Sequence, residues 1–232
     1  MSYSKRLDGR QFDELRPMEA KVGVIPNAVG SARFKTGHTV ALAAVYGPRL
    51  LHPAKLRNPK AGRLRCYYNM MPFSGHGNRV RPGHSRRSQE ISLVMEKALA
   101  PVVDLSAFPN SVIDVFVEFP QTDAGTRCAA ITAASMALAD AGIPMKSIVT
   151  SVSVGKVEDK VLVDLTYDEE AYSENVADIP MAILPNTGEV TLLQMDGGVT
   201  KEQLIEALEL GKKASQEVYE LQVRSLKEKY GN

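Results

Sequence analysis

The sequence predicts an α+β fold with mixed sheets, formed by one domain that spans residues 1–232. Hydrophobic residues change between short strand-like runs and helical spacing, in the order several strands, helix, strand, helix, several strands, helix. No linker or low-complexity segment divides the chain. With 232 residues, of which 44% are hydrophobic, the chain is long enough to bury one large core.

The first third of the chain is predicted to form strands separated by turns and loops. Gly and Asn mark the turns, and the runs between them are β-branched or alternate between polar and apolar residues. Loops are expected at 50–63, which is rich in Pro, Lys and Arg, and at 74–85, which is rich in Gly and basic residues. The predicted strands are 22–25, 31–34, 39–46 and 64–72.

Two helices and one strand are predicted in the middle of the chain. Apolar residues at helical spacing predict a helix that begins near Arg86 and ends at Pro101. The alternating run 112–119 predicts a strand. The alanine-rich run 126–141 predicts a buried helix whose small side chains allow close packing on a sheet, with Gly142 as its C-terminal stop.

The last part of the chain is predicted to form two hairpins and a long helix. The helix begins at Thr200, where Gln203 completes a capping box, and runs toward Lys229. The paired strands of the hairpins are 148–157 with 160–165, and 180–184 with 189–194.

Charged residues are distributed unevenly, although the formal net charge is only +1. The interval between Glu19 and Glu90 holds thirteen Lys and Arg and no acid, whereas residues 114–196 carry fourteen acids against four basic residues. A basic half is typical of a protein that binds a polyanion such as nucleic acid. The alternative is a solvated basic face that the acidic half balances.

The composition argues against several classes of protein. No run of eighteen apolar residues predicts a transmembrane helix, and the polar N-terminal segment has no apolar signal core, so a cytoplasmic protein is expected. Cys66 and Cys128 fit neither a CxxC nor a zinc pattern and are expected to be reduced, buried thiols. Four histidines show no metal-binding spacing and are interpreted as loop or surface residues: His38, His52, His76 and His84.

The stretch QTDAGTRCAAITAAS, residues 121–135, resembles an anion-binding loop placed before a helix. Gly125 permits unusual backbone dihedrals and close approach of a ligand. The first N–H groups of a helix lack internal partners and lie at the positive end of its dipole. Thr126 can cap the helix or donate its hydroxyl, and Arg127 adds donors suited to phosphate oxygens. These features predict a phosphate site, and the alternative is an ordinary capped helix with Arg127 in solvent.

Arg86 and Arg87 form a second basic helix start. The helix dipole opposes cations at this position, so local helix stability does not explain the two arginines, whereas a bound anion would. The alternative is a pair of solvated arginines.

Two further stretches carry candidate site residues. The acidic stretch 164–180 lies between two predicted strands, with Asp178 at the start of the second. Such carboxylates can hold Mg²⁺ or supply a general acid, and the alternative is a solvated acidic loop. In RCYYNM, residues 65–70, aromatic residues beside an arginine suit stacking of single-stranded bases. Tyr67 and Tyr68 would point to opposite faces of a strand, so at most one would face a ligand.

Six motifs follow one another along the chain: RLDGRQFDELRP, AAVYGPR, RCYYNMMPFS, RRSQEIS, DAGTRCAAITAASMALADAGIPM and TGEVTLLQMDG. Together they resemble the ribonuclease PH family over nearly the whole chain, from Arg6 to the final helix. Within that family the likeness is greatest to the catalytic ring subunits of archaeal exosomes, because DELRP, YNMMPFS and LADAGIPM favour them over the free-standing bacterial enzyme.

The resemblance implies a fold and an activity. The fold would be a two-layer βα architecture of the ribosomal protein S5 domain 2 type, with two related halves in one compact domain. The activity would be phosphorolysis of RNA from the 3′ end, assisted by Mg²⁺. Inorganic phosphate attacks the last phosphodiester and a nucleoside 5′-diphosphate leaves, and the nearly balanced reverse reaction adds a tail to RNA.

The resemblance also assigns roles to individual residues. It implies that the basic half guides RNA inward while the acidic cluster beside the phosphate site serves the chemistry. The roles are phosphate binding for Gly125, Thr126, Arg127 and Arg87, and RNA binding for Arg65, Arg86, Arg87 and, by base stacking, Tyr68.

The acidic pair departs from the family pattern. The family has an Asp six residues before the Asp that opens the next strand. The second of these matches Asp178, but the stretch DEEAYSENVADIP is two residues longer and holds Glu170 at the aligned position. Asp178 and Glu170 are expected to hold Mg²⁺ and, with Arg127, to serve catalysis.

The resemblance implies a hexameric ring of three active and three inactive related subunits, with RNA-binding cap proteins on top. One alternative is a homohexameric ribonuclease PH that trims transfer RNA ends. Another is an inactive scaffold that only binds RNA, which Glu170 favours and the intact phosphate loop opposes. A hydrolytic nuclease is a further alternative, although an arginine-rich site suits phosphate better than an activated water.

Overall fold

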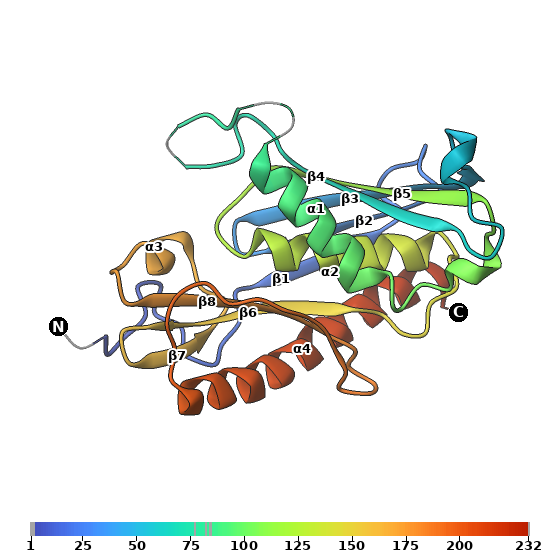
Figure 1. The fold of residues 1–232 in the computed structure, drawn as a ribbon. Helices are drawn as coiled ribbons and strands as arrows, with labels where there is room; N and C mark the ends of the chain where they lie inside the picture. The colour runs from blue at the N-terminus through green and yellow to red at the C-terminus, as the bar shows by residue number, and fades with distance from the viewer. Residues whose placement is uncertain (1–2, 77, 82, 84, 232) are drawn as a thin grey trace.

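The computed structural model describes residues 3–76, 78–81, 83 and 85–231 and contains two sheets with helices packed against both (Figure 1). The first sheet has five strands in the order β1-β2-β3-β5-β4. β4 runs parallel to β5 whereas the other neighbours are antiparallel, which confirms the prediction of mixed sheets. The strands are β1 Met18–Val22, β2 Gly30–Thr36, β3 Thr39–Leu50, β4 Arg63–Met70 and β5 Ser111–Gln121.

The second sheet has four antiparallel strands in the order β7-β6-β8-β9. The inner strand β6 is buried along its whole length, because α2 packs on one face of the sheet and α4 packs on the other. The strands are β6 Thr150–Val157, β7 Lys160–Val163, β8 Val176–Ile183 and β9 Val190–Leu193.

Helix α2, Thr126–Asp140, lies between the two sheets and contacts strands of both (Figure 1). Thirteen of its fifteen residues are buried, as expected for a helix that is apolar on all sides. The start of β2 touches the end of this helix at Gly30, where an added Cβ would lie 2.2 Å from the main-chain nitrogen of Ala141. Small residues therefore let α2 pack tightly, and its N-terminus is held rigidly at one edge of the sheets.

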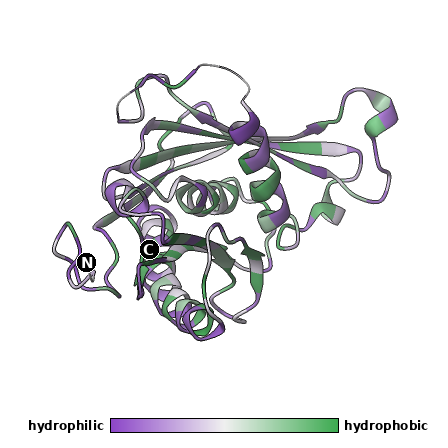
Figure 2. Ribbon diagram, turned by 60° about the vertical axis from the view of Figure 1, so that its left-hand side comes forward, coloured by the Kyte–Doolittle hydropathy of each residue, from purple (hydrophilic) through white to green (hydrophobic). Residues whose placement is uncertain are grey.

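Two further helices pack against the sheets. α1, Arg86–Leu99, packs on β4 and touches β9. α4, Lys201–Tyr230, lies on β6 and β7, reaches β1, and begins with the predicted capping box of Thr200 and Gln203. Figure 2 shows hydrophilic and hydrophobic residues interspersed along α4, as expected of a helix with one face on a sheet and the other in solvent.

The predicted strand at 22–25 is wrong. The strand is Met18–Val22, which pairs with β2, and it ends where Gly23 adopts a φ of 71°. Val24 and Ile25, which follow Gly23, lie in neither strand nor helix and lead into a turn at Pro26 and Asn27. The β-branched residues of 22–25 favour a strand, but the glycine in this run ends the strand.

The acidic stretch also differs from the prediction. β8 begins at Val176, four residues before the predicted strand, because residues 176–179 already pair with β6. A four-residue helix, α3 Tyr167–Glu170, precedes it and was not predicted. Its capping box of Thr166 and Glu169 is readable in the sequence, but one turn is too short to give a helical period.

The loops agree with the prediction where the structure describes them. The region 51–62 holds only a short 3₁₀ turn, Ala54–Leu56. The described residues between Met71 and Ser85 form neither helix nor strand, and three residues of that predicted loop, Gly77, Pro82 and His84, lie outside the described residues. No helix in the described part of the chain is both long and apolar enough to cross a membrane.

One hydrophobic cluster extends through both sheets. It includes Val45 and Val117 of the first sheet, Val154 and Ile179 of the second, and most of α2. Cys66 and Cys128 are buried and free, as predicted. The observed elements confirm an α+β class, and that one domain spans residues 1–232 stays a prediction.

Candidate active site

The loop before α2 has an unusual backbone conformation. Ala124 and Gly125 adopt consecutive positive φ angles of 53° and 62°, and Gly125 is the N-cap residue of the helix. The hydroxyl oxygen of Thr39 lies 2.9 Å from the main-chain oxygen of Asp123 and 2.8 Å from that of Ala124, which fixes the loop. Thr126 is the first helical residue, so it does not cap α2, and no described side chain does so. The N–H groups of the first turn are therefore free to bind a ligand.

This first turn lines a cleft of about 490 Å³. The cleft gathers residues that are far apart in the sequence, from α1, α2, the end of α3, β6 and β8. Candidate site residues predicted from the sequence that line it are Arg87, Gly125, Thr126, Arg127, Glu170 and Asp178. The structure thus brings both predicted phosphate-binding stretches and both predicted carboxylates to one place.

Two arginines enter the cleft from two helix N-termini. Nη2 of Arg87 in α1 donates to the hydroxyl oxygen of Thr126 in α2 over 3.4 Å. Nη2 of Arg127 donates to Glu90 over 3.1 Å, and its Nη1 lies 4.0 Å from Asp178. The Nε of Arg127 is buried without a hydrogen-bond partner in the described residues. A buried donor without a partner is costly, so an anion bound here would satisfy it.

The two predicted carboxylates face these arginines. Asp178 lies in β8 and accepts a hydrogen bond from the hydroxyl of Ser153 in the neighbouring strand β6. Glu170 ends α3 and lines the same cleft. Asp196 exchanges two main-chain hydrogen bonds of 2.9 Å with Asp178 and also lines the cleft. The acidic side of the cleft therefore opposes its basic side.

Electrostatics set this carboxylate pair apart from the other acids. Burial and the charge of Asp178 raise the pKa of Glu170 to about 7, although Arg87, Arg16 and Arg127 act in the opposite direction. Burial also raises the pKa of Asp178, against the hydrogen bond from Ser153. Two neighbouring carboxylates with raised pKa values can share a proton or bind a cation.

The predicted RNA-binding residues are not all near the cleft. Arg86 is exposed at the start of α1 and is not among the residues that line the cleft. Arg65 donates to Asp114 over 2.7 Å on the open face of the first sheet. On that same face, Tyr67 stacks on Phe116 with ring centroids 4.7 Å apart. The sequence correctly placed Tyr67 and Tyr68 on opposite faces of a strand.

Tyr68 requires a correction. Its side chain is on the core side and is only 4% exposed, packed against Phe119, so a base cannot stack on its ring in this conformation. Its hydroxyl is buried without a hydrogen-bond partner among the described residues. Thr126 and Arg87 are near enough to lower the pKa of this tyrosine, although burial raises it overall. The hydroxyl, and not the ring face, is therefore the part of Tyr68 directed toward the site.

Sequence reasoning missed the residues that support the cleft from behind. Arg16, which is only 4% exposed, pairs with the buried Asp164 over 2.6 Å and also contacts Asp123. Ser153 and Asp196, described above, were missed as well. Arg16 and Asp123 belong to quoted motifs, but an ion pair between residues so far apart in sequence leaves no signal in one sequence. Among the described residues, no group of three or more His, Cys, Asp or Glu side chains is arranged to hold a metal.

The chain matches family models along most of its length. Residues 14–144 match the family described as 3′ exoribonuclease family, domain 1, and residues 147–214 match domain 2 of the same family, both of the RNase PH type. The boundary between the two matches lies after α2, where the first sheet gives way to the second.

Similar proteins cover nearly the whole chain. A protein named exosome complex component Rrp41 from Pyrococcus furiosus is 53% identical over 226 residues, which is 97% of this chain and 89% of that protein. One of the same name from Methanopyrus kandleri is 50% identical over 97% of this chain and 93% of its own length. The crystal structure of rice (Oryza sativa) Rrp46 matches with a TM-score of 0.85 and 25% identity, over 96% of this chain and 100% of that one.

These matches confirm both the family resemblance read from the six motifs and the ribonuclease PH-like fold. The chain belongs to the ribonuclease PH family of 3′ exoribonucleases.

Proposed function

We propose that this protein is a phosphorolytic 3′–5′ exoribonuclease and acts as the catalytic subunit of an exosome-type ring. The ribonuclease PH family uses inorganic phosphate for this reaction. The observation that carries the proposal is the cleft, where the buried Nε of Arg127 has no partner among the described residues and faces two carboxylates with raised pKa values.

The attacking phosphate would bind at the N-terminus of α2. The main-chain N–H groups after Gly125, the hydroxyl of Thr126 and the guanidinium groups of Arg87 and Arg127 offer donors to phosphate oxygens. These four kinds of donor together favour binding of a multiply charged anion. Nη2 of Arg87 already reaches Thr126, so the two arginines are placed to contact one ligand.

The reaction balances as a displacement at phosphorus. An oxygen of inorganic phosphate forms a bond to the terminal phosphorus of the RNA, and the bond from that phosphorus to the preceding 3′ oxygen breaks. The departing 3′ oxygen takes a proton, which leaves a nucleoside 5′-diphosphate and an RNA shorter by one residue. The pKa of Glu170 is raised to about 7 and that of Asp178 is raised as well, so this carboxylate pair can supply the proton. Run backward, the same steps add a tail to RNA.

The carboxylate pair also fits Mg²⁺. This ion is held by one or two carboxylates together with substrate phosphates, and burial of Glu170 beside Asp178 leaves negative charge that a cation would offset. Asp178 and Glu170 would hold it. When bound, Mg²⁺ would stabilise the charge that develops on the reacting phosphates.

RNA would reach the cleft along the basic half of the chain. Arg86 is exposed beside Arg87 at the start of α1, where it can contact a phosphate of the RNA backbone. Arg65 could do so from the open sheet face if it is released from Asp114. Tyr68 is proposed to contribute through its hydroxyl group.

A hexameric ring of this chain with an inactive ribonuclease PH-like paralogue, topped by RNA-binding cap proteins, is part of the proposal. Its support is the name exosome complex component shared by the similar archaeal proteins. A homohexamer that trims transfer RNA and an inactive scaffold remain the competing hypotheses. A cytoplasmic location fits two free, buried cysteines, since reducing compartments preserve thiols.

The test is shortening of a 5′-labelled single-stranded RNA with Mg²⁺, with and without inorganic phosphate. The chain is assayed alone and mixed with its candidate ring partner. Phosphate-dependent shortening is expected, and dependence on the partner selects the exosome-type ring over the homohexamer. RNA binding with no shortening in any mixture would instead identify an inactive scaffold.

A further inference from the structure

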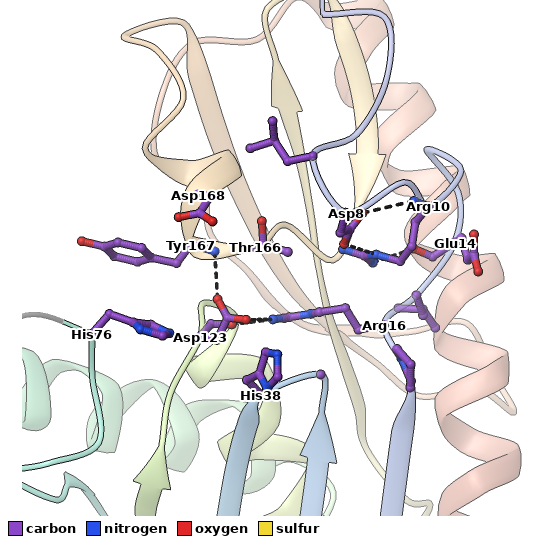
Figure 3. Close-up of a pocket in the computed structure, with 14 residues that line it drawn as sticks. Asp8, Arg10, Glu14, Arg16, His38, His76, Asp123, Thr166, Tyr167 and Asp168 are labelled. Atoms are coloured by element: carbon purple, nitrogen blue, oxygen red, sulfur yellow. Dashed lines mark hydrogen bonds and ion pairs between the residues drawn. The ribbon is translucent and has the colours of Figure 1, made fainter.

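A second cleft lies behind the phosphate loop, between the N-terminal segment, the loop before α2 and the start of α3 (Figure 3). Arg16 crosses this region toward Asp123, as Figure 3 shows. Its guanidinium is buried and is bonded on two sides. The two sides belong to different halves of the molecule, one carrying the phosphate loop and the other carrying the carboxylates.

On the carboxylate side, Arg16 binds Asp164 in a two-pronged arrangement. Nε lies 2.8 Å from Oδ2 and Nη2 lies 2.6 Å from Oδ1, and the main-chain N–H of Arg16 also donates to Oδ2 over 2.9 Å. Asp164 has a positive φ of 55°, a conformation that is costly for a residue with a side chain. It directly precedes the segment that forms α3 and ends at Glu170.

On the phosphate side, Arg16 holds the loop before α2. Its Nη1 donates to the main-chain oxygen of Asp123 and lies 3.5 Å from the carboxylate of that residue. The other oxygen of this carboxylate accepts the N–H of Tyr167, the first residue of α3, over 3.2 Å. An added Cβ at Gly125 would lie only 3.3 Å from Nη2 of Arg16. The guanidinium therefore packs directly under the loop that carries the proposed phosphate site.

We propose that Arg16 is a positioning residue that sets the distance between the phosphate-binding loop and the carboxylate pair. This inference rests on the proposed function, because it matters only if phosphate and carboxylates act on one substrate. Arg16 does not line the catalytic cleft; it contacts Asp123 and Asp164, and its charge also opposes the rise in the pKa of Glu170 that burial causes.

Stability alone is a weak reason for this arrangement. Burying a guanidinium and a carboxylate costs desolvation energy that their attraction only roughly repays, and well-packed apolar residues often serve stability equally well. An apolar pair cannot form directional contacts with three groups at once. Arg16 does so with the main-chain oxygen of Asp123, the carboxylate of Asp123 and the carboxylate of Asp164. Catalysis is sensitive to such placement, since a shift of about 1 Å can cost about 10²-fold in rate.

The test compares Arg16→Met and Arg16→Lys with a matched control, Lys229→Met. Lys229 pairs with the buried Asp140 over 2.6 Å at the opposite end of α2, so the control also breaks an ion pair on this helix. The full chain, assembled with its ring partner where activity needs one, is used for the thermal midpoint, for RNA affinity without phosphate, and for kcat and KM for phosphate.

Arg16→Met is expected to lower kcat/KM for phosphate about 10²-fold while RNA affinity stays within about twofold. Arg16→Lys is expected to lose less activity than Arg16→Met, because lysine keeps the positive charge but cannot make the two-pronged contact with Asp164. Lys229→Met should keep kcat/KM within about twofold of wild type, although it also lowers thermal stability.

Wild-type kcat/KM in Arg16→Met would overturn the proposal, as would equal losses in Arg16→Met and Lys229→Met. Should Arg16→Met not fold, Asp123→Asn replaces it, since it removes the carboxylate contact but keeps the main-chain acceptor. It is expected to lose about tenfold in kcat/KM, and full activity would contradict the proposal. A wild-type protein with no phosphate-dependent activity would instead reject the proposed function.

Discussion

At the C-terminal end of α2, the carboxylate of Asp140 is fully paired, whereas at the N-terminal end Arg127 and the carboxylates facing it are not. Asp140 accepts from Lys229 over 2.6 Å, from the hydroxyl of Tyr230 over 2.8 Å and from the N–H of Ser31 over 2.9 Å. Burial opposes ionisation of Asp140, but these bonds hold its pKa below its usual range. The Nε of Arg127 is buried with no partner in the described part of the chain, and the pKa of Glu170 is raised to about 7.

The contrast separates two uses of polar groups on one helix. The Asp140 end joins α2 to α4 and β2 and gives stability. Among the described residues, the Arg127 end has a buried donor without a partner and two carboxylates with raised pKa values. Such groups lower stability, and a bound ligand would satisfy them. Substitutions at the Arg127 end should therefore change activity more than stability. Substitutions at the Asp140 end should change stability more than activity.

The largest effect is expected for Arg127→Ala. It removes a charge-assisted donor from the phosphate site and should lower kcat/KM for phosphate by about 10³-fold, because a preorganised donor of this kind is worth about 10²–10³ in rate and the charge is lost as well. The thermal midpoint should change little. Steady-state kinetics against phosphate concentration measure the effect, and wild-type turnover would show that Arg127 is not part of the site.

Asp178→Asn should have the next largest effect. An amide keeps the size of the side chain but neither carries the proton nor binds a cation well, so kcat should fall by about 10²-fold or more. RNA affinity, measured by fluorescence anisotropy without Mg²⁺, should be retained. Loss of RNA binding together with activity would place Asp178 in the RNA path instead of in the chemistry.

Lys229→Met tests the other end of the helix. It should lower the free energy of unfolding by about 1–2 kcal/mol, less than for a fully buried pair because Lys229 is 39% exposed. Urea denaturation measures this. The stabilisation by Asp140 is present above the pKa that this residue has in the unfolded chain, and it should fade as the pH drops through its lowered folded value. An unchanged unfolding curve would contradict the stabilising role.

The smaller of the two stability effects is expected for Glu170→Gln, and its sign is opposite. A raised folded pKa of about 7 means that wild type loses stability as the pH rises from the unfolded value toward and through 7. Glutamine avoids that loss, so the variant should be more stable than wild type by about 1 kcal/mol at pH 8 and nearly equal at pH 5. Urea titrations at the two pH values, with EDTA present, test this difference. Lower stability of the variant at pH 8 would reject it.

Part of this contrast between the two ends of α2 could be predicted from the sequence. The Gly-Thr-Arg stretch before an alanine-rich run predicted both the buried helix and the anion site, because backbone freedom, exposed N–H groups and charge are local properties. The family motifs extended this to the ribonuclease PH fold, which the comparisons confirm. Glu170 and Asp178 were expected beside the phosphate loop, and the structure places them there.

Other parts depended on packing between distant segments. The burial of Tyr68 follows from which face of β4 meets the core, and alternation alone does not choose between the two faces. The Arg16–Asp164 pair joins residues 148 positions apart. The strand at Met18–Val22 was missed because its stability comes from pairing with β2 and not from its own composition.

The most direct test of an anion site at the N-terminus of α2 is to follow the phosphate itself. Radiolabelled inorganic phosphate is incubated with unlabelled RNA, Mg²⁺ and the assembled protein, with Arg127→Ala and Lys229→Met in parallel, and the products are separated by chromatography. Label in nucleoside 5′-diphosphates from wild type and Lys229→Met, with almost none from Arg127→Ala, is the predicted result. Release of unlabelled nucleoside monophosphates, or equal labelling by all three proteins, would contradict it.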